Sequence, residues 1–285
     1  MKGIILAGGY GKRLNPITFS ISKHLLPIYN KPLIYYPLSI LMLANIKDIL
    51  LITKSEDLIL FKKLLGDGSD YGIKINYAIQ EKPKGIAQAF TIGENFIGSD
   101  KVCLILGDNI FWGDGLHKKL LNAKKNLNGN VIFSYNVDNP QDFAVLEKSS
   151  RGIKIIEKPK NNTNKQVVTG LYFYDNSVIN LAKKIKPSSR GELEITSINN
   201  IYAKKNKTKV INLGRGFAWY DAGTFSNLLK ASMFIQTIEH RQGMRIACLE
   251  EIALNKKWIT LKKFKKLISK YENNEYGNYL KVLSK

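Results

Sequence analysis

The sequence predicts an α/β fold with a mixed, mainly parallel central sheet, a small β insertion and a helical C-terminal region. Three observations support this prediction. Over about the first 130 residues, short β-rich runs alternate with longer helical patterns, which is typical of βαβ units. From residue 131 the pattern changes to closely spaced hairpin-like strands, and after residue 223 it is helical to the end.

The first half of the chain supplies the parallel part of the sheet. Its expected strands are residues 3–7, 48–53, 73–79 and 102–106. Its expected helices are residues 34–44, 57–64, 86–96 and 116–126. The uninterrupted apolar runs at 4–6 and 103–106 favour strands that are covered on both faces. Ligands of such sheets bind beyond the carboxyl ends of the strands.

The second half is expected to add a pocket wall and then return to the core. Hairpin-like strands are expected at residues 131–135, 144–147, 154–157 and 167–174. Two helices and one strand should follow, at residues 176–184, 192–204 and 209–213. We therefore divide the chain into residues 1–240, which include the insertion at about 131–175, and a helical extension at 241–285.

The formal charge of +21 comes from 44 Lys and Arg residues against 23 Asp and Glu residues. Only 6 of these cations are Arg and 38 are Lys. A protein that recognises phosphates or guanines would favour Arg, because the planar guanidinium can make two parallel hydrogen bonds to those acceptors. The lysine excess is more typical of mutational bias spread over solvated surface. A nucleic-acid-binding protein is the alternative, and it predicts steeply salt-dependent binding to duplex DNA.

Cysteine, histidine and apolar patterns exclude other classes. Cys103 and Cys248 make no disulfide framework and indicate a reducing compartment. The three histidines are too scattered for a zinc site, and HExxH is absent. The most apolar stretch, residues 33–46, is too short to cross a bilayer. We expect a cytoplasmic protein that acts on neither membranes nor nucleic acids.

A glycine-rich segment follows the first expected strand and contains Gly8, Gly9, Gly11, Lys12 and Arg13. Glycines at a strand end let backbone N–H groups approach a phosphate closely. The spacing does not fit a P-loop, because a glycine five residues before Gly11 is missing and Arg13 replaces Ser or Thr. It also lacks the third glycine and the ribose-binding acid of a dinucleotide fingerprint. Since the first acidic residue is Asp48, the segment predicts a site for several phosphates.

An ordered set of motifs extends beyond this segment. It comprises Gly8-Gly9-x-Gly11-x-Arg13-Leu14, Ser22-Lys23-x-Leu25-Leu26-Pro27 and the segments 31–38, 64–69, 107–111 and 191–196. In these motifs the chain resembles the sugar-1-phosphate nucleotidyltransferases over nearly its whole length. The resemblance implies a Rossmann-like nucleotidyltransferase fold. It also implies that residues 1–240 are catalytic, that the insertion binds a sugar, and that residues 241–285 make contacts in a homotetramer.

The resemblance implies a reaction between two anions. Glucose 1-phosphate would attack the α-phosphorus of dTTP and expel pyrophosphate without a covalent intermediate, as the first step of dTDP-sugar (dTDP-rhamnose) synthesis. Positive charge and a metal, Mg²⁺, would then be the main catalytic resource. Asp108 follows an apolar strand, and Mg²⁺ is typically held by one or two carboxylates plus substrate phosphates.

Site residues are implied by the same resemblance. The catalytic cations are Arg13, Lys23 and Lys158, and the metal carboxylates are Asp108 and Asp221. The nucleotide-binding positions are Leu6, Gly8, Gly9, Gly11, Lys12, Arg13, His24, Gln80, Gly85 and Asp108. The sugar-phosphate-binding positions are Lys23, Asn109, Ala144, Glu157, Lys158, Val168 and Thr169.

The chain departs from the family pattern at several positions near these sites. They are Tyr10, Lys12, His24, Phe143, Ala144 and Ala222. A uridylyl- or cytidylyltransferase acting on the same sugar phosphate therefore stays an alternative. An inactive sugar-nucleotide sensor is a second alternative, and the retained Arg13, Lys23, Asp108, Lys158 and Asp221 argue against it.

Overall fold

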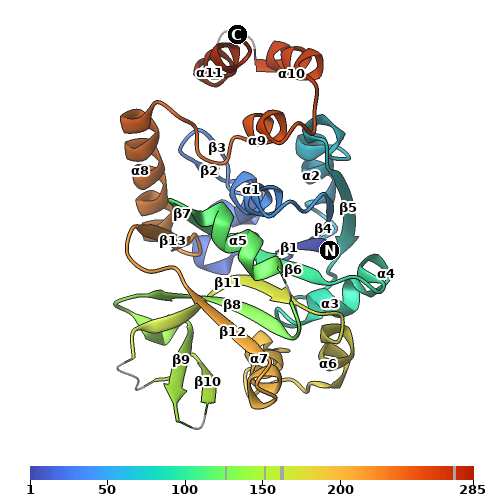
Figure 1. Ribbon diagram of the computed structural model, residues 1–285, viewed down its shortest axis with the longest axis vertical. Helices are drawn as coiled ribbons and strands as arrows, with labels where there is room; N and C mark the ends of the chain where they lie inside the picture. Colours follow the sequence, from blue (N-terminus) through green and yellow to red (C-terminus); the bar gives the residue numbers. More distant parts are fainter. Residues whose placement is uncertain (126, 151, 161–163, 272–273) are drawn as a thin grey trace.

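The computed structural model describes residues 1–125, 127–150, 152–160, 164–271 and 274–285. Within these residues a nine-stranded mixed sheet forms the centre of the molecule (Figure 1). The main path of the sheet runs in the order β10-β9-β11-β6-β1-β4-β5; off this path, β8 pairs with β11, and β12 pairs with β8. Together with the helices on its two faces, this sheet confirms the predicted fold class.

The parallel half of the sheet contains β1 (Lys2–Ala7), β4 (Asp48–Thr53), β5 (Lys74–Ile79) and β6 (Val102–Leu106). β1 pairs in parallel with both β4 and β6, and β4 pairs in parallel with β5. These four strands match the predicted ones to within one residue. Their carboxyl ends share one edge of the sheet, where the glycine-rich segment begins.

The antiparallel half contains β8 (Asn130–Asn136), β9 (Ala144–Ser149), β10 (Gly152–Glu157) and β11 (Gln166–Tyr174). β11 pairs antiparallel with β6, β8 and β9, while β12 (Thr208–Asn212) runs parallel to β8. β8, β9, β10 and β11 are therefore all members of the main sheet, and the β9–β10 hairpin forms its end at the bottom of Figure 1. The predicted strands at residues 131–135, 144–147, 154–157 and 167–174 are confirmed.

Helices cover both faces of the sheet. One face carries α1 (Tyr35–Leu43), α2 (Leu58–Leu65) and α5 (Leu116–Lys124). The other carries α3 (Gln88–Ile92), α4 (Glu94–Ile97), α6 (Val178–Lys184) and α7 (Ile195–Lys204). The single helix expected at residues 86–96 is wrong, because the chain breaks at Gly93. A Cβ on Gly93 would lie 3.0 Å from the Ile4 side chain, so the backbone approaches the sheet closely there. The predicted end of the helix 116–126 falls on residue 126, outside the described residues.

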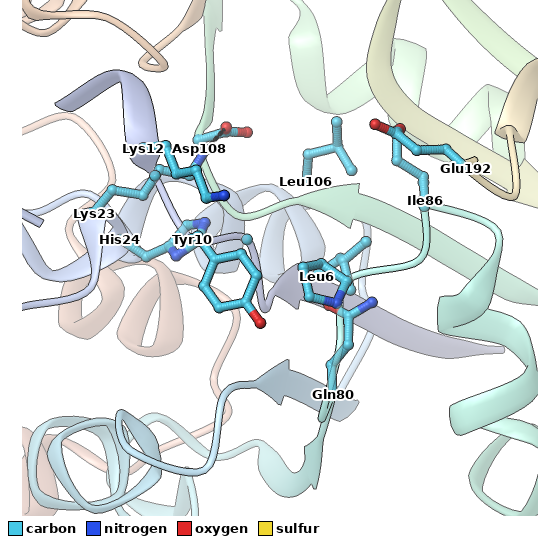
Figure 2. A pocket seen from close by; sticks show the side chains of 14 residues that line it. Leu6, Tyr10, Lys12, Lys23, His24, Gln80, Ile86, Leu106, Asp108 and Glu192 are labelled. Carbon is cyan, nitrogen blue, oxygen red and sulfur yellow. Dashed lines mark hydrogen bonds and ion pairs between the residues drawn. The ribbon is translucent and has the colours of Figure 1, made fainter. Parts of the chain in front are cut away.

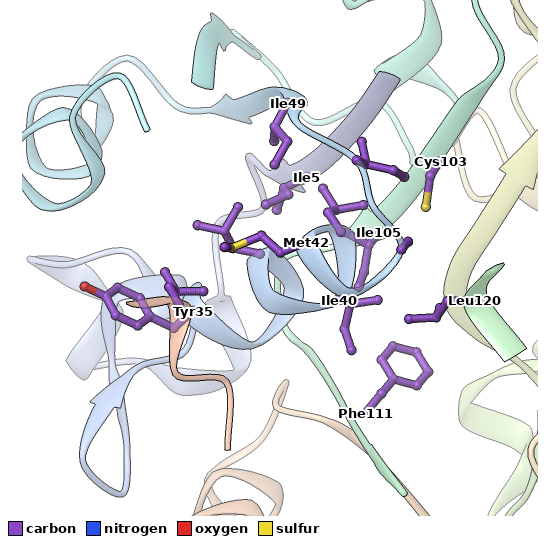
Figure 3. Packing of buried hydrophobic residues seen from close by; sticks show 14 of the residues in the cluster. Ile5, Tyr35, Ile40, Met42, Ile49, Cys103, Ile105, Phe111 and Leu120 are labelled. Atoms are coloured by element: carbon purple, nitrogen blue, oxygen red, sulfur yellow. The ribbon is translucent and has the colours of Figure 1, made fainter. Parts of the chain in front are cut away.

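The core follows the period-two alternation of the strands. Ile5, Ile49, Leu51, Cys103 and Ile105 face the α1 side, where Ile40 and Met42 pack over them (Figure 3). Their neighbours Ile4, Leu50, Ile52, Val102 and Leu104 face the α3 side. Burial on both faces explains why these strands have continuous apolar sequences.

A second, two-stranded sheet joins β7 (Asn109–Gly113) to β13 (Phe217–Asp221) in antiparallel fashion. The sequence analysis predicted neither strand. Both are short, and their partners lie about a hundred residues apart in the chain, so no local pattern marks the pairing. A short hairpin of β2 (Pro27–Ile28) and β3 (Lys31–Pro32) was missed for the same reason of length.

The C-terminal region is helical, as predicted. It contains α8 (Phe225–Gln242), α9 (Leu249–Asn255), α10 (Leu261–Ile268) and α11 (Glu275–Leu283). In α10, Phe264, Leu267 and Ile268 are buried in the core on the α1 side, whereas Leu261 is 47% exposed. The division at residue 240 stays a prediction. Among the described residues, no helix combines the length and apolar character needed to span a membrane.

A buried ion cluster ties α8 to the β2–β3 hairpin. Lys31 Nζ lies 2.8 Å from Glu239 Oε1, and both side chains are at most 2% exposed. Arg245 and Asn30 donate to Glu239 Oε2 at 2.8 and 2.7 Å. The negative charge of Glu239 thus compensates the positive charges of Lys31 and Arg245, whose side chains are largely buried.

Glu239→Gln is expected to lower the free energy of unfolding by about 3 to 5 kcal/mol, because Lys31 would be left buried without a counter-ion. Urea denaturation would measure the change. The matched control is Glu94→Gln, which removes the exposed Lys183–Glu94 pair and should cost less than about 1 kcal/mol. Equal effects of the two variants would contradict this account.

Candidate active site

The glycine-rich segment is held at both ends by close packing. A Cβ on Gly8 would lie 2.1 Å from Gln80 Oε1 and 3.0 Å from Gln80 Cβ, so a larger residue there would displace the Gln80 side chain. Gly11 adopts a left-handed φ of 64°, and Leu14 is fully buried at the end of the short 3₁₀ helix Lys12–Leu14. These anchors leave Lys12 and Arg13 exposed beside the carboxyl end of β1.

A cavity of about 370 Å³ opens beside this segment (Figure 2). Eight of the predicted nucleotide positions line it, namely Leu6, Gly9, Gly11, Lys12, His24, Gln80, Gly85 and Asp108. Gly8 lies against Gln80 instead, and Arg13 lines a neighbouring cavity. Tyr10 also lines the first cavity, with the Lys12 ammonium 5.8 Å from the centre of its ring. The structure thus brings most of the predicted set around one space. Their roles as ligand contacts stay predictions.

His24 is a buried, neutral member of this cavity. Its Nδ1 lies 3.1 Å from Ser22 Oγ, and its ring packs over Gly107. Burial, with the nearby Lys23 ammonium, lowers the pKa of His24 to about 3. The imidazole therefore offers hydrogen bonds to a ligand and no charge at neutral pH.

A second cavity of about 360 Å³ adjoins the first. Every predicted sugar-phosphate position lines it, namely Lys23, Asn109, Ala144, Glu157, Lys158, Val168 and Thr169. Arg13 and Asp221 line it as well. The residues that line both cavities are Lys23, Ile86, Leu106, Asp108 and Glu192. The two cavities therefore meet at Lys23 and Asp108.

Asn109 and Thr169 contribute to the second cavity mainly by holding its wall. Asn109 Oδ1 accepts from Trp219 Nε1 at 2.7 Å and from the Gly170 amide at 3.0 Å. Its Nδ2 donates to Asp108 Oδ1 at 2.9 Å. Thr169 Oγ1 donates to the Phe133 carbonyl at 3.1 Å. Because these side chains are engaged inside the protein, they orient Asp108 and the wall around it.

Glu157 lies in a polar network on the same wall. Its Oε2 accepts from Thr196 Oγ1 at 2.5 Å, and its Oε1 lies 3.3 Å from Arg190 Nη1. Arg190 also pairs with Glu192 at 3.1 Å. No role was predicted for Arg190 or Thr196 from the sequence, although Arg190 precedes the motif 191–196 and Thr196 is its last residue. Proximity to that motif was the available signal.

Lys158 has an unusual backbone conformation. Its φ of 40° lies in the left-handed region, which is uncommon for a residue other than glycine. The amide of Lys158 donates to the Phe143 carbonyl at 3.1 Å, and Pro159 follows. Such conformations are often found at active sites and ligand-binding sites. This observation favours the predicted role of Lys158, which lines the second cavity.

The β7–β13 pairing brings the two predicted metal carboxylates together. Asp221 stands opposite Asn109, and the Ala222 amide donates to the Asp108 carbonyl at 3.0 Å. Asp108 pairs with Lys23. Although burial acts to raise the pKa of Asp108, the Lys23 ammonium more than offsets it and the pKa lies below the usual range. Burial, reinforced by the charge of Asp108, raises the pKa of Asp221.

Asp221 Oδ1 is buried and has no hydrogen-bond partner among the described residues. A buried carboxylate oxygen without a hydrogen-bond partner is costly unless a cation binds it. No group of three or more His, Cys, Asp or Glu side chains in the described part of the chain is arranged to hold a metal. Two carboxylates fit the chemistry of Mg²⁺, which takes its remaining ligands from water and substrate phosphates.

Two cavities that meet at Lys23 and Asp108, one of them beside the predicted phosphate-binding loop, suit transfer between two phosphate-bearing ligands. The fold and this arrangement define a nucleotidyltransferase. The sequence profile of the family described as "Nucleotidyl transferase" matches residues 2–238. The chain therefore belongs to the nucleotidyl transferase family, and its curated relatives are named glucose-1-phosphate thymidylyltransferase.

Curated relatives of that name cover the whole chain. The protein from Neisseria meningitidis is 53% identical over 100% of both chains. The protein from Xanthomonas campestris pv. campestris is 48% identical over 100% of this chain and 97% of its own. Among solved structures, a candidate glucose-1-phosphate thymidylyltransferase from Bacillus anthracis in complex with sucrose superposes with a TM-score of 0.76. It is 41% identical, and the match covers 82% of this chain and 94% of that one.

A UDP-glucose pyrophosphorylase complexed with UDP-glucose shares the fold at lower identity. Its TM-score is 0.71 and its identity is 22%, with 83% of this chain and 98% of that chain covered. At this identity the likeness establishes the fold alone. Base and sugar selection must therefore be argued from the residues of this chain.

Proposed function

We propose that this enzyme transfers the thymidylyl group of dTTP to α-D-glucose 1-phosphate, giving dTDP-glucose and pyrophosphate. One observation carries the proposal. The cavity beside the phosphate loop and the cavity lined by Glu157 and Lys158 meet at Lys23 and Asp108. Two ligands placed in these cavities would bring their phosphates together at that junction.

In this proposal dTTP occupies the first cavity. The thymine base lies against Gln80 and Gly85, and the triphosphate runs along Gly8 to Arg13. Backbone N–H groups of the segment and the ammonium of Lys12 then face the phosphates. Glucose 1-phosphate occupies the second cavity, where Glu157 accepts from the sugar hydroxyls and Lys158 faces the sugar phosphate.

The chemical step is a direct in-line displacement. An oxygen of the sugar phosphate attacks the α-phosphorus, the bond from that phosphorus to the bridging oxygen breaks, and pyrophosphate leaves. Arg13 and Lys158 stabilise the charge that develops at the phosphorus. Lys23, which pairs with Asp108 in the free protein, exchanges this partner for the two phosphates. Orientation of two anions by fixed cations is the main contribution of the chain.

Mg²⁺ is the proposed cofactor, and Asp108 and Asp221 would hold it. When bound, it would neutralise phosphate charge at the reacting phosphorus. Asp221 Oδ1, which has no hydrogen-bond partner within the described residues, supports this assignment. We further propose that the enzyme catalyses the first step of dTDP-rhamnose or other dTDP-sugar synthesis, in the cytoplasm. We expect a homotetramer, with residues 241–285 at subunit contacts.

A nucleotide panel tests the proposal. The enzyme is incubated with glucose 1-phosphate, Mg²⁺ and one of dTTP, UTP or CTP, and pyrophosphate release is measured. We expect the highest kcat/KM with dTTP and loss of turnover when EDTA removes the metal. Preference for UTP or CTP would overturn the base assignment. Binding of dTDP-glucose without turnover of any nucleotide would instead support the inactive sensor.

A further inference from the structure

We propose that Gln88 is a positioning residue that fixes the orientation of the Gln80 amide and thereby selects a thymine or uracil base over cytosine. The inference rests on the proposed function, because it takes the nucleotide base to lie against Gln80 and Gly85. It assigns a specific role to Gln88, and it explains base selection at the level of single atoms.

Gln80 is held so that its amide has few orientations. It follows the end of β5, and its backbone amide donates to the Thr53 carbonyl at 2.8 Å. Its side chain is 3% exposed and lines the first cavity (Figure 2). Oε1 lies so close to Gly8 that a Cβ there would be 2.1 Å away. The remaining freedom is essentially a flip that exchanges the oxygen and the nitrogen of the amide.

Gln88 removes that freedom through a short chain of hydrogen bonds. The backbone amide of Lys84 can only donate, so the Gln88 atom that lies 2.9 Å from it must be Oε1. The same oxygen lies 2.8 Å from the Gln80 amide, which must therefore present Nε2 to it. Gln80 Oε1 is then left on the side of Gly8 and the cavity. In the described part of the chain, no donor is hydrogen-bonded to Gln80 Oε1.

Gly85 supplies a donor beside this acceptor. Its φ of 111° and its contact with Leu193, 2.5 Å from a Cβ that glycine lacks, fix the backbone there. Two backbone hydrogen bonds hold the residues on either side of Gly85. The Leu193 amide donates to the Lys84 carbonyl at 2.6 Å, and the Leu193 carbonyl accepts from the Ala87 amide at 3.1 Å. No described group accepts from the Gly85 amide. The base end of the cavity thus presents one acceptor and one donor in fixed positions.

This pattern matches thymine and uracil. Both bases carry an N3–H donor next to a carbonyl acceptor, which can pair with Gln80 Oε1 and the Gly85 amide. In cytosine N3 is an acceptor and N4 is a donor, so its N3 lone pair would face Gln80 Oε1. A buried polar atom opposed by a like atom loses its hydrogen bond and keeps its desolvation cost. The pattern does not separate thymine from uracil, because both present the same edge.

The test compares two substitutions of Gln88. Gln88→Met removes the acceptor while keeping the length of the side chain, so Gln80 becomes free to flip. Gln88→Glu keeps an oxygen that can accept from both Lys84 and Gln80. The measured quantity is the ratio of kcat/KM for dTTP to that for dCTP, with glucose 1-phosphate and Mg²⁺ present. We expect the ratio to fall about tenfold in Gln88→Met, the equivalent of one lost hydrogen bond, and to stay within about twofold in Gln88→Glu.

Controls separate orientation from packing. Gln236→Met, at an exposed position of α8, should leave the ratio unchanged. If Gln88→Met does not fold, Gln88→Leu replaces it. An unchanged ratio in the apolar variant, or an equal fall in the apolar and Glu variants, would overturn the inference.

Failure of the proposed function gives a different result. In that case the wild-type enzyme makes no pyrophosphate from dTTP and glucose 1-phosphate. The ratio is then taken from the dissociation constants of dTTP and dCTP, measured by calorimetry without the sugar. A wild-type preference for dTTP that falls in Gln88→Met and persists in Gln88→Glu would still support the role of Gln88. Equal affinities of the wild type for the two nucleotides would overturn it.

Discussion

Asp108→Asn is expected to lower kcat by at least about 10³-fold while the protein stays folded. The amide that replaces the carboxylate is neutral, so the junction of the two cavities loses the charge that would hold Mg²⁺. Lys23 also loses its partner. Pyrophosphate release at saturating substrates and Mg²⁺ measures the effect, and thermal unfolding checks the fold. The exposed Asp70→Asn, which removes only a surface pair with Lys270, is the matched control and should keep full activity.

Asp221→Asn should produce a similar loss of activity. Unlike Asp108→Asn, it should also make the metal-free protein more stable. In the metal-free protein its Oδ1 is buried, has no hydrogen-bond partner in the described part of the chain and lies near the charge of Asp108. An amide removes that like-charge contact, so we expect the metal-free variant to be more stable by about 1 kcal/mol. Retention of more than a tenth of the wild-type kcat in either variant would refute the carboxylate pair as the metal site.

Arg13→Lys is expected to lower kcat/KM by about 10² to 10³-fold although it conserves the charge. The Arg13 guanidinium lines the second cavity and lies against Gly223, where a Cβ would be 2.5 Å from its Nη2. A guanidinium can hold two phosphate oxygens at once, whereas an ammonium acts as a single charge point. Initial rates over a matrix of dTTP and glucose 1-phosphate concentrations would measure the loss.

The division of this loss between kcat and KM is informative. If Arg13 stabilises the developing charge, kcat falls and the KM for glucose 1-phosphate changes little. A rise in KM alone would mean that Arg13 only binds the ground state. Arg241→Lys, at an exposed position near the end of α8, is the matched control and should leave both constants unchanged.

The sequence and the structure agree best where local chemistry is sufficient. The parallel strands and most helices could be predicted because apolar periodicity is a local property. The glycine-rich segment could also be predicted, since its spacing excludes the common phosphate loops and no carboxylate precedes Asp48. By contrast, the helix expected at residues 86–96 breaks at Gly93, where the approach of the sheet overrides the local pattern.

The sequence by itself determined the fold class, the position of the glycine-rich segment and, through resemblance, which side chains to examine. Only the tertiary structure decided how they act together. Asp108 and Asp221 become a pair through the β7–β13 register, and Gln80 acquires its orientation from Gln88 and the Lys84 amide. The physical reason is that these relations depend on directional contacts, some between residues more than a hundred positions apart, while periodicity and spacing record only what neighbouring residues require.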